Sequence, residues 1–90
     1  MTSKLKLSPA ATAVAAEILR LTQHMNQIVC TQENLASLTS LKTNTVYKAL
    51  IELTTVGAIE DTPRRDGIRT IVPNSDHWIW SAIVQESGLS

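Results

Sequence analysis

The stretch that decides the fold lies in the middle of the 90-residue chain and reads Leu35-Ala36-Ser37-Leu38-Thr39-Ser40-Leu41-Lys42-Thr43-Asn44-Thr45-Val46. Thr31 can cap a helix just before it, and leucines and an alanine then share one side of that helix. After a polar turn, apolar residues recur at helical spacing as far as Gly57, which is well placed to end a helix: Val46, Ala49, Leu50 and Leu53. We predict two helices, over 32–38 and 43–56.

The residues before this stretch predict a further helix and a short strand. Ser8 followed by Pro9 is a helix start signal, and apolar residues after it recur every three or four positions. They predict a helix over 9–23. Residues 27–30 form a short segment with β-branched side chains, so they could add one edge strand.

The residues after Gly57 change from a helical period to a period of two. This change predicts paired strands over 58–62 and 68–72. The turn between them has Asp66-Gly67 as its strongest signal. The chain therefore carries a β-hairpin directly after its central helices.

This order of elements resembles the winged helix-turn-helix of bacterial regulators, and is similar to GntR-like and MarR-like DNA-binding domains. The residues that carry the resemblance are Leu35-Ala36, Thr45-Val46, and the Leu53, Gly57 and Ile59 at and just after the end of the helix predicted over 43–56. The resemblance covers residues 31–72. It implies an α+β, mostly helical fold with a three-helix core, a β-hairpin wing and, here, an extra C-terminal helix, in a single domain over 1–90.

Two residues depart from the family pattern. Ser40 stands where the family usually has glycine, so the backbone there carries about 1 kcal/mol of strain if its φ is positive. Lys42 stands at the usual cap position and has no side-chain acceptor. We therefore expect Thr43 to take over the cap and to move the helix start by one residue.

The outward side of the helix predicted over 43–56 is polar near its N-terminus, the end that a helix-turn-helix protein inserts into the major groove. Asn can pair with adenine, Thr can contact a thymine methyl group, and Lys can reach guanine or phosphate. The candidate DNA-contacting residues here are Lys42, Thr43, Asn44, Thr45, Tyr47 and Lys48. The resemblance adds wing residues for the flanking minor groove or its phosphates: Arg64, Arg65 and Arg69. Ile51 shares the outward side and could cover sugar atoms, contact another chain or pack under a terminal segment.

The net charge is zero, with eight basic and eight acidic side chains, but its distribution is uneven. Segments 39–50 and 62–70 together carry +4, and the rest of the chain carries −4. If both cationic segments lie on one face, that face attracts an anionic partner.

The C-terminal segment predicts a last helix over 75–87, which Asn74 or Ser75 can cap. Its apolar residues span roughly 240° of the helix circumference, and we expect a domain this small to cover only one side of it. The hypothesis is a two-fold dimer contact with one tryptophan facing the partner, made by Trp78, Trp80, Ile83 and Val84. The alternative is an ordinary closing helix with a half-exposed tryptophan.

Composition limits the remaining function classes. The single cysteine, Cys30, allows no internal disulfide, and no apolar run of about 18 residues could span a membrane, which favours a cytoplasmic, nucleoid-associated protein. Cys30, His24 and His77 lack ligand-like spacing, so we expect no metal, and neither a cofactor nor a small-molecule ligand is evident. Glu60 and Asp61 are adjacent on a strand and point to opposite faces, which suits no acid–base pair. We therefore expect that the protein is not an enzyme.

The leading hypothesis is sequence-specific binding of double-stranded DNA, as a homodimer on an inverted repeat, by a small transcriptional regulator without an effector domain. A variant of it is the DNA-binding component of a plasmid, phage or viral replication or partition complex. The alternative is a winged-helix protein-interaction module, in which Tyr47, Ile51 and the tryptophans form the binding surface. The neutral net charge favours this alternative.

Overall fold

A computed structural model describes residues 7–23 and 25–87. Its elements follow the order α1 (Pro9–Leu21), β1 (Ile28–Thr31), α2 (Gln32–Thr39), α3 (Thr43–Thr55), β2 (Ile59–Pro63), β3 (Ile68–Pro73) and α4 (Trp78–Ser87). No helix in these ranges is long and apolar enough to cross a bilayer.

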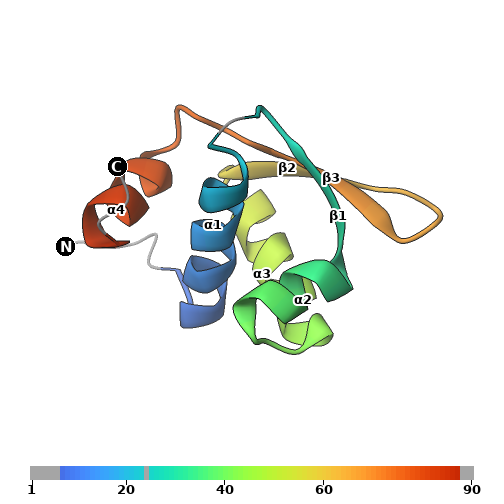
Figure 1. Ribbon diagram of the computed structural model, residues 1–90. Helices are drawn as coiled ribbons and strands as arrows, with labels where there is room; N and C mark the ends of the chain where they lie inside the picture. The colour runs from blue at the N-terminus through green and yellow to red at the C-terminus, as the bar shows by residue number, and fades with distance from the viewer. Residues whose placement is uncertain (1–6, 24, 88–90) are drawn as a thin grey trace.

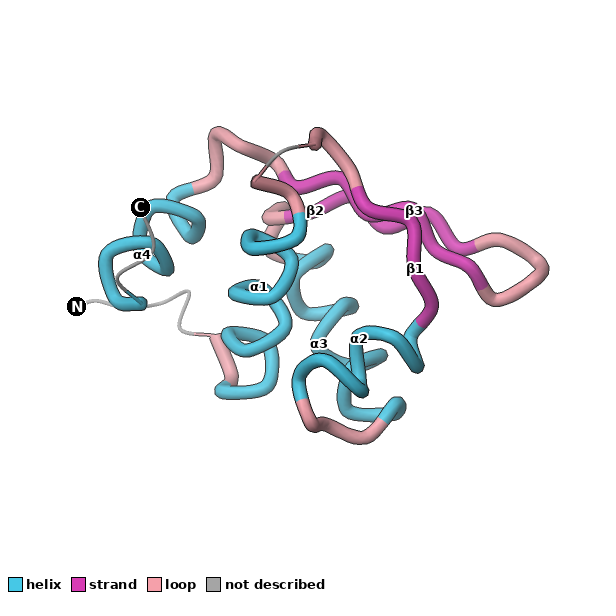
Figure 2. Tube along the Cα trace, in the orientation of Figure 1, coloured by secondary structure: helices cyan, strands magenta, loops and turns pink. Residues whose placement is uncertain are grey.

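The three strands form one antiparallel sheet in the order β1-β3-β2. Helices α1, α2 and α3 lie together on one face of the sheet, and the β2–β3 hairpin extends beyond them (Figure 1; Figure 2). Helix α4 packs on α1 at the end of the molecule away from the hairpin (Figure 1). Because β1 lies at one edge, the expectation of an edge strand at this point is confirmed.

Apolar residues from all seven elements and from the loop before β2 form one core. Its largest fully buried side chains come from the helices and from β3: Val14, Ile18, Leu35, Val46, Leu50, Leu53 and Ile71. The buried residues of α3 are those expected from the helical spacing. The opposite side of α3 is therefore left toward solvent.

Local hydrogen bonds fix where the first helix begins. The Ser8 hydroxyl oxygen accepts from the Ala11 N–H at 3.1 Å, and Pro9 occupies the first turn. The Glu52 carboxylate of α3 accepts from both the N–H and the hydroxyl of Ser8, at 2.8 and 2.9 Å. These bonds tie the start of α1 to α3. They engage Glu52, the one acidic side chain of α3, at a distance from the N-terminus of that helix.

The turn between α2 and α3 fulfils one condition stated from the sequence and corrects one expectation. Ser40 is left-handed, with φ 61°, so the condition for backbone strain at this residue is met. The prediction that Thr43 replaces Lys42 as the cap is wrong. Lys42 is the cap residue of α3 in extended conformation, without a side-chain hydrogen bond, because the tight turn fixes its backbone and Thr43 is already helical.

The start of the last helix also differs from the prediction. Helix α4 begins at Trp78, not at residue 75. Asn74 does not cap it, because the Asn74 side chain donates to the Gly57 carbonyl and accepts from the Asp76 N–H. The His77 Nδ1 instead accepts from the Ile79 N–H at 3.2 Å, while its Nε2 lies 3.0 Å from the Val56 carbonyl oxygen.

Candidate nucleic-acid interface

The first two turns of α3 present an exposed polar surface. Lys42, Thr43, Asn44, Tyr47 and Lys48 are exposed, and Thr45 is half-buried. The first turn of α3 contains no acidic residue. Its free backbone N–H groups and the positive end of the helix dipole therefore suit an anion such as a phosphate.

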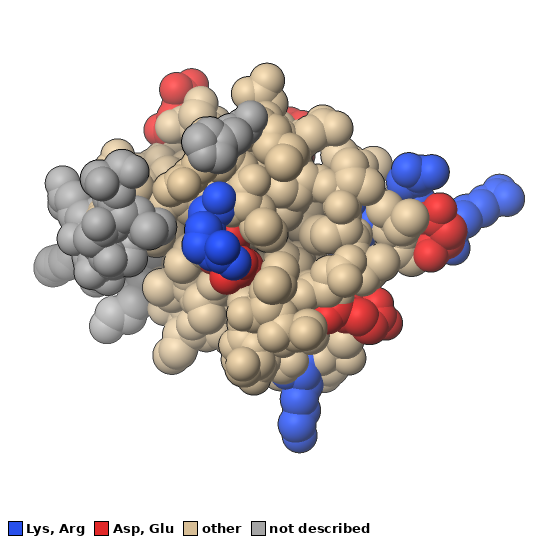
Figure 3. Space-filling view, viewed as in Figure 1, with Lys and Arg blue, Asp and Glu red and all other residues tan. Residues whose placement is uncertain are grey.

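The wing brings a second exposed cationic group. Its tip, residues 64–67, is closed by a hydrogen bond from the Arg64 N–H to the Ile68 carbonyl oxygen at 2.8 Å, and Gly67 supplies φ 85°. Arg64 lies 3.8 Å from Asp66 in an exposed ion pair of the kind that contributes little stability. Arg65 is exposed and has no ion-pair partner in the described ranges. Figure 3 shows basic side chains projecting from the wing beside an acidic one.

Arg69 differs from the other two wing arginines. It lies in β3, not at the tip, and only 8% of it is exposed. It forms an ion pair with Asp61 of β2, and its Nη2 donates to the Gln32 Oε1 at 2.6 Å. Because its polar atoms are engaged and buried, Arg69 is not free to contact DNA in this structure. Its expected role as a wing contact is replaced by a structural one.

A chain of contacts then joins the wing strands to the start of α3. The Arg69 guanidinium carbon lies 5.6 Å from the centre of the Tyr47 ring. The Gln32 Nε2 donates to the Thr43 carbonyl oxygen at 3.4 Å. Gln32 and Asp61 were not among the residues predicted for this site. Through them the outer side of α3 and the wing lie next to each other.

The exposed charge on this surface is smaller than the sequence suggested. In segments 39–50 and 62–70, once Arg69 is neutralised by Asp61, the exposed charges are Lys42, Lys48, Arg64 and Arg65 against Asp66, a net charge of +3, which the exposed Glu60 of β2 lowers to +2 for the whole surface. Glu52 is held by Ser8, as described above. The surface therefore remains cationic.

A comparison with solved structures identifies a protein of similar fold. A crystal structure of a MarR family transcription regulator aligns with a TM-score of 0.64 over 93% of this chain, at 20% sequence identity. The fold is a winged helix-turn-helix. The match covers 54% of that regulator, so the chain spans about half its length. No protein-family model and no curated protein matches the sequence.

Of the four α4 residues expected to contact a second copy, only Trp78 is exposed. Trp80 is 7% exposed and Ile83 is also buried, because both pack into the core. Val84 is half-buried. Trp78 is exposed and its ring lies 5.5 Å from that of His77. The structure therefore resembles the ordinary closing helix with a partly exposed tryptophan more than an open apolar helix.

Proposed function

We propose that this winged helix binds double-stranded DNA with sequence preference and acts as a transcriptional regulator. In this proposal α3 enters the major groove, and the wing tip lies on the flanking backbone or minor groove. The observation that supports it most is the adjacency of the exposed α3 N-terminus and the cationic wing, joined through Tyr47, Arg69 and Gln32.

The proposal divides the exposed residues by role. Asn44 and Tyr47 read base edges, because they lie on the outward side of the first turns of α3. Lys42 and Arg65 contact phosphates, which carry no sequence information. Regulation by occupying a site is the simplest mode of action, and a role in a replication or partition complex would use the same surface.

A mobility-shift assay with random duplex DNA at low salt tests the proposal. Retardation at micromolar protein supports it, because nonspecific binding through a cationic face occurs at about 1–100 µM even at physiological salt. The Arg65→Ala variant should lower the slope of log affinity against log salt by about 0.9 if that side chain contacts one phosphate.

Absence of retardation would instead favour a protein-interaction module. The exposed Tyr47 and Ile51 favour that candidate, since an apolar strip on α3 suits a protein surface. In that case the Tyr47→Ala variant should lose binding to the protein partner.

A further inference from the structure

The two edges of the sheet differ in how they are protected against pairing. The β2 edge carries the exposed Glu60 and ends in Pro63, both of which discourage the addition of another strand. The β1 edge, Ile28-Val29-Cys30-Thr31, has neither a charge nor a proline. No other strand lies on the outer side of β1 in the described part of the chain. The β1 edge is therefore open to pairing, except at the Thr31 N–H, which donates to Asn34 Oδ1 at 3.2 Å.

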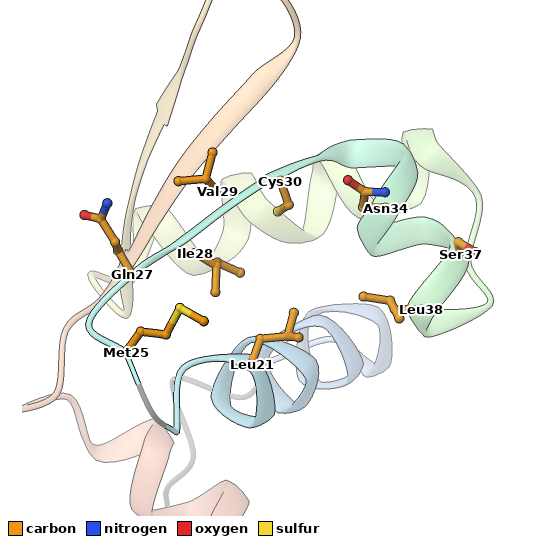
Figure 4. Close-up of a pocket in the computed structure, with 9 residues that line it drawn as sticks. All are labelled: Leu21, Met25, Gln27, Ile28, Val29, Cys30, Asn34, Ser37 and Leu38. Carbon is orange, nitrogen blue, oxygen red and sulfur yellow. The ribbon is translucent and has the colours of Figure 1, made fainter.

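An apolar groove lies directly beside this open edge. It has a volume of about 680 Å³ and lies between the end of α1, β1 and α2. Ile28 and Cys30 point from β1 toward α1, and Leu21 and Leu38 face them (Figure 4). Every residue that lines it is uncharged. A strand added to β1 would cover this groove with alternate side chains.

Three of the six large apolar side chains that are exposed in the described residues line this groove: Met25, Val29 and Leu38, at 58%, 56% and 49% exposed. The other three, Tyr47 and Ile51 on α3 and Trp78 on α4, are exposed to a similar extent but do not line it. A contiguous apolar patch with a polar rim marks an interaction surface, whereas a single exposed side chain does not.

We propose that the occupant of this groove is a second copy of the chain, with the two β1 strands paired antiparallel across a two-fold axis. In a two-fold interface each surface contacts an identical surface, so a charged lining would place like charges opposite each other. The lining of this groove is uncharged and avoids that repulsion. A charged partner would find no complementary charge in the groove. Pairing would join the two sheets into one of six strands.

The symmetry of this pairing agrees with the proposed function, on which its biological purpose rests. A two-fold axis between antiparallel strands stands perpendicular to the sheet. It keeps both helical layers on the same face and directs the two wings in opposite directions. Neither α3 nor the wing lines the groove, so both DNA-facing surfaces stay free. A two-fold dimer of this kind suits an inverted repeat.

Sedimentation velocity without DNA tests the interface. The wild type should sediment as a dimer at about 100 µM, and Leu38→Glu should raise the dimer Kd by about 100-fold, because it places unpaired carboxylates in the interface. Val29→Lys is a second variant with the same expected effect. Both positions are exposed, so neither substitution disturbs the core. Trp78→Glu is the matched control and should leave the dimer intact.

Amide hydrogen exchange gives an independent readout of strand pairing. Exchange should slow in the wild-type dimer at the outward-facing β1 amides, which are those that donate neither to β3 nor, as Thr31 does, to the Asn34 side chain, and it should return to the monomer rate in Leu38→Glu. A wild type that stays monomeric, a dimer broken by Trp78→Glu but not by Leu38→Glu, or a dimer with unprotected β1 amides would each overturn the proposal. Because no DNA is present, failure here leaves the DNA-binding proposal to be decided by the mobility shift.

Discussion

Replacing Arg69 with methionine should destabilise the fold far more than its place on a wing suggests. Arg69 and Asp61 are each 10% exposed at the side chain and form an ion pair. The second carboxylate oxygen of Asp61, Oδ1, is buried and has no hydrogen-bond partner among residues 7–23 and 25–87. In Arg69→Met, the Asp61 charge would stay buried without compensation. Breaking such a pair typically costs about 3–5 kcal/mol.

That loss is large beside the total stability of the domain. A chain of this length has a free energy of unfolding of about 5–14 kcal/mol. The Asp61→Asn/Arg69→Met double variant removes both charges and should lie within about 2 kcal/mol of wild type. The two single substitutions should therefore be coupled by about 2 kcal/mol or more.

Urea unfolding followed by circular dichroism gives the four free energies of this cycle. Arg65→Met is the matched control, because Arg65 is an exposed wing arginine and its loss should cost no more than about 0.5 kcal/mol. A cost below about 1 kcal/mol for Arg69→Met, or additive single effects, would refute the assignment of a buried structural ion pair.

Three further predictions concern the turn between α2 and α3, the Cys30 thiol and the exposed side chains of α3 and the wing. Ser40→Gly should raise the free energy of unfolding by about 0.5–1 kcal/mol in a thermal melt, because glycine adopts φ 61° without strain; a loss would contradict this. Burial and, to a smaller extent, the Asp61 charge raise the pKa of the Cys30 thiol, so alkylation of Cys30 should require a higher pH than alkylation of an exposed cysteine. The contribution of the protonated thiol to stability should be lost as pH rises through its folded pKa. An alkylation profile like that of an exposed cysteine would contradict this. Asn44→Ala and Tyr47→Ala should reduce preference for a selected DNA site, whereas Arg65→Ala should weaken binding to every duplex; equal losses on selected and random DNA for all three would contradict the division of roles.

The helices could be predicted closely because their signals are local. The buried positions of α3 follow from spacing alone, and Ser8 and Thr31 cap their helices through residues three positions away. The left-handed backbone of Ser40 could only be stated as a condition, because a serine in a turn can also adopt a negative φ. Element ends shifted by one to three residues, most of all at α4, where His77 replaced the expected caps.

The role of Arg69 could not be predicted, because it depends on register and on a distant partner. Pro63 lies opposite Arg69 in the hairpin, which places Asp61 diagonally across the strands on the same face. Gln32 lies 37 positions away in the sequence and reaches Arg69 only after β1 pairs with β3. The apolar pattern of α4 likewise indicated how much of it is buried, but not that α1 and the core would cover Trp80 and Ile83.

An NMR titration of isotope-labelled protein with duplex DNA maps the DNA-binding surface residue by residue. We expect amide shift changes concentrated at residues 42–48 and 64–67, with α4 unaffected. Changes confined to α4 or to the β1 groove, or no changes at low salt, would contradict a DNA-binding surface made by α3 and the wing.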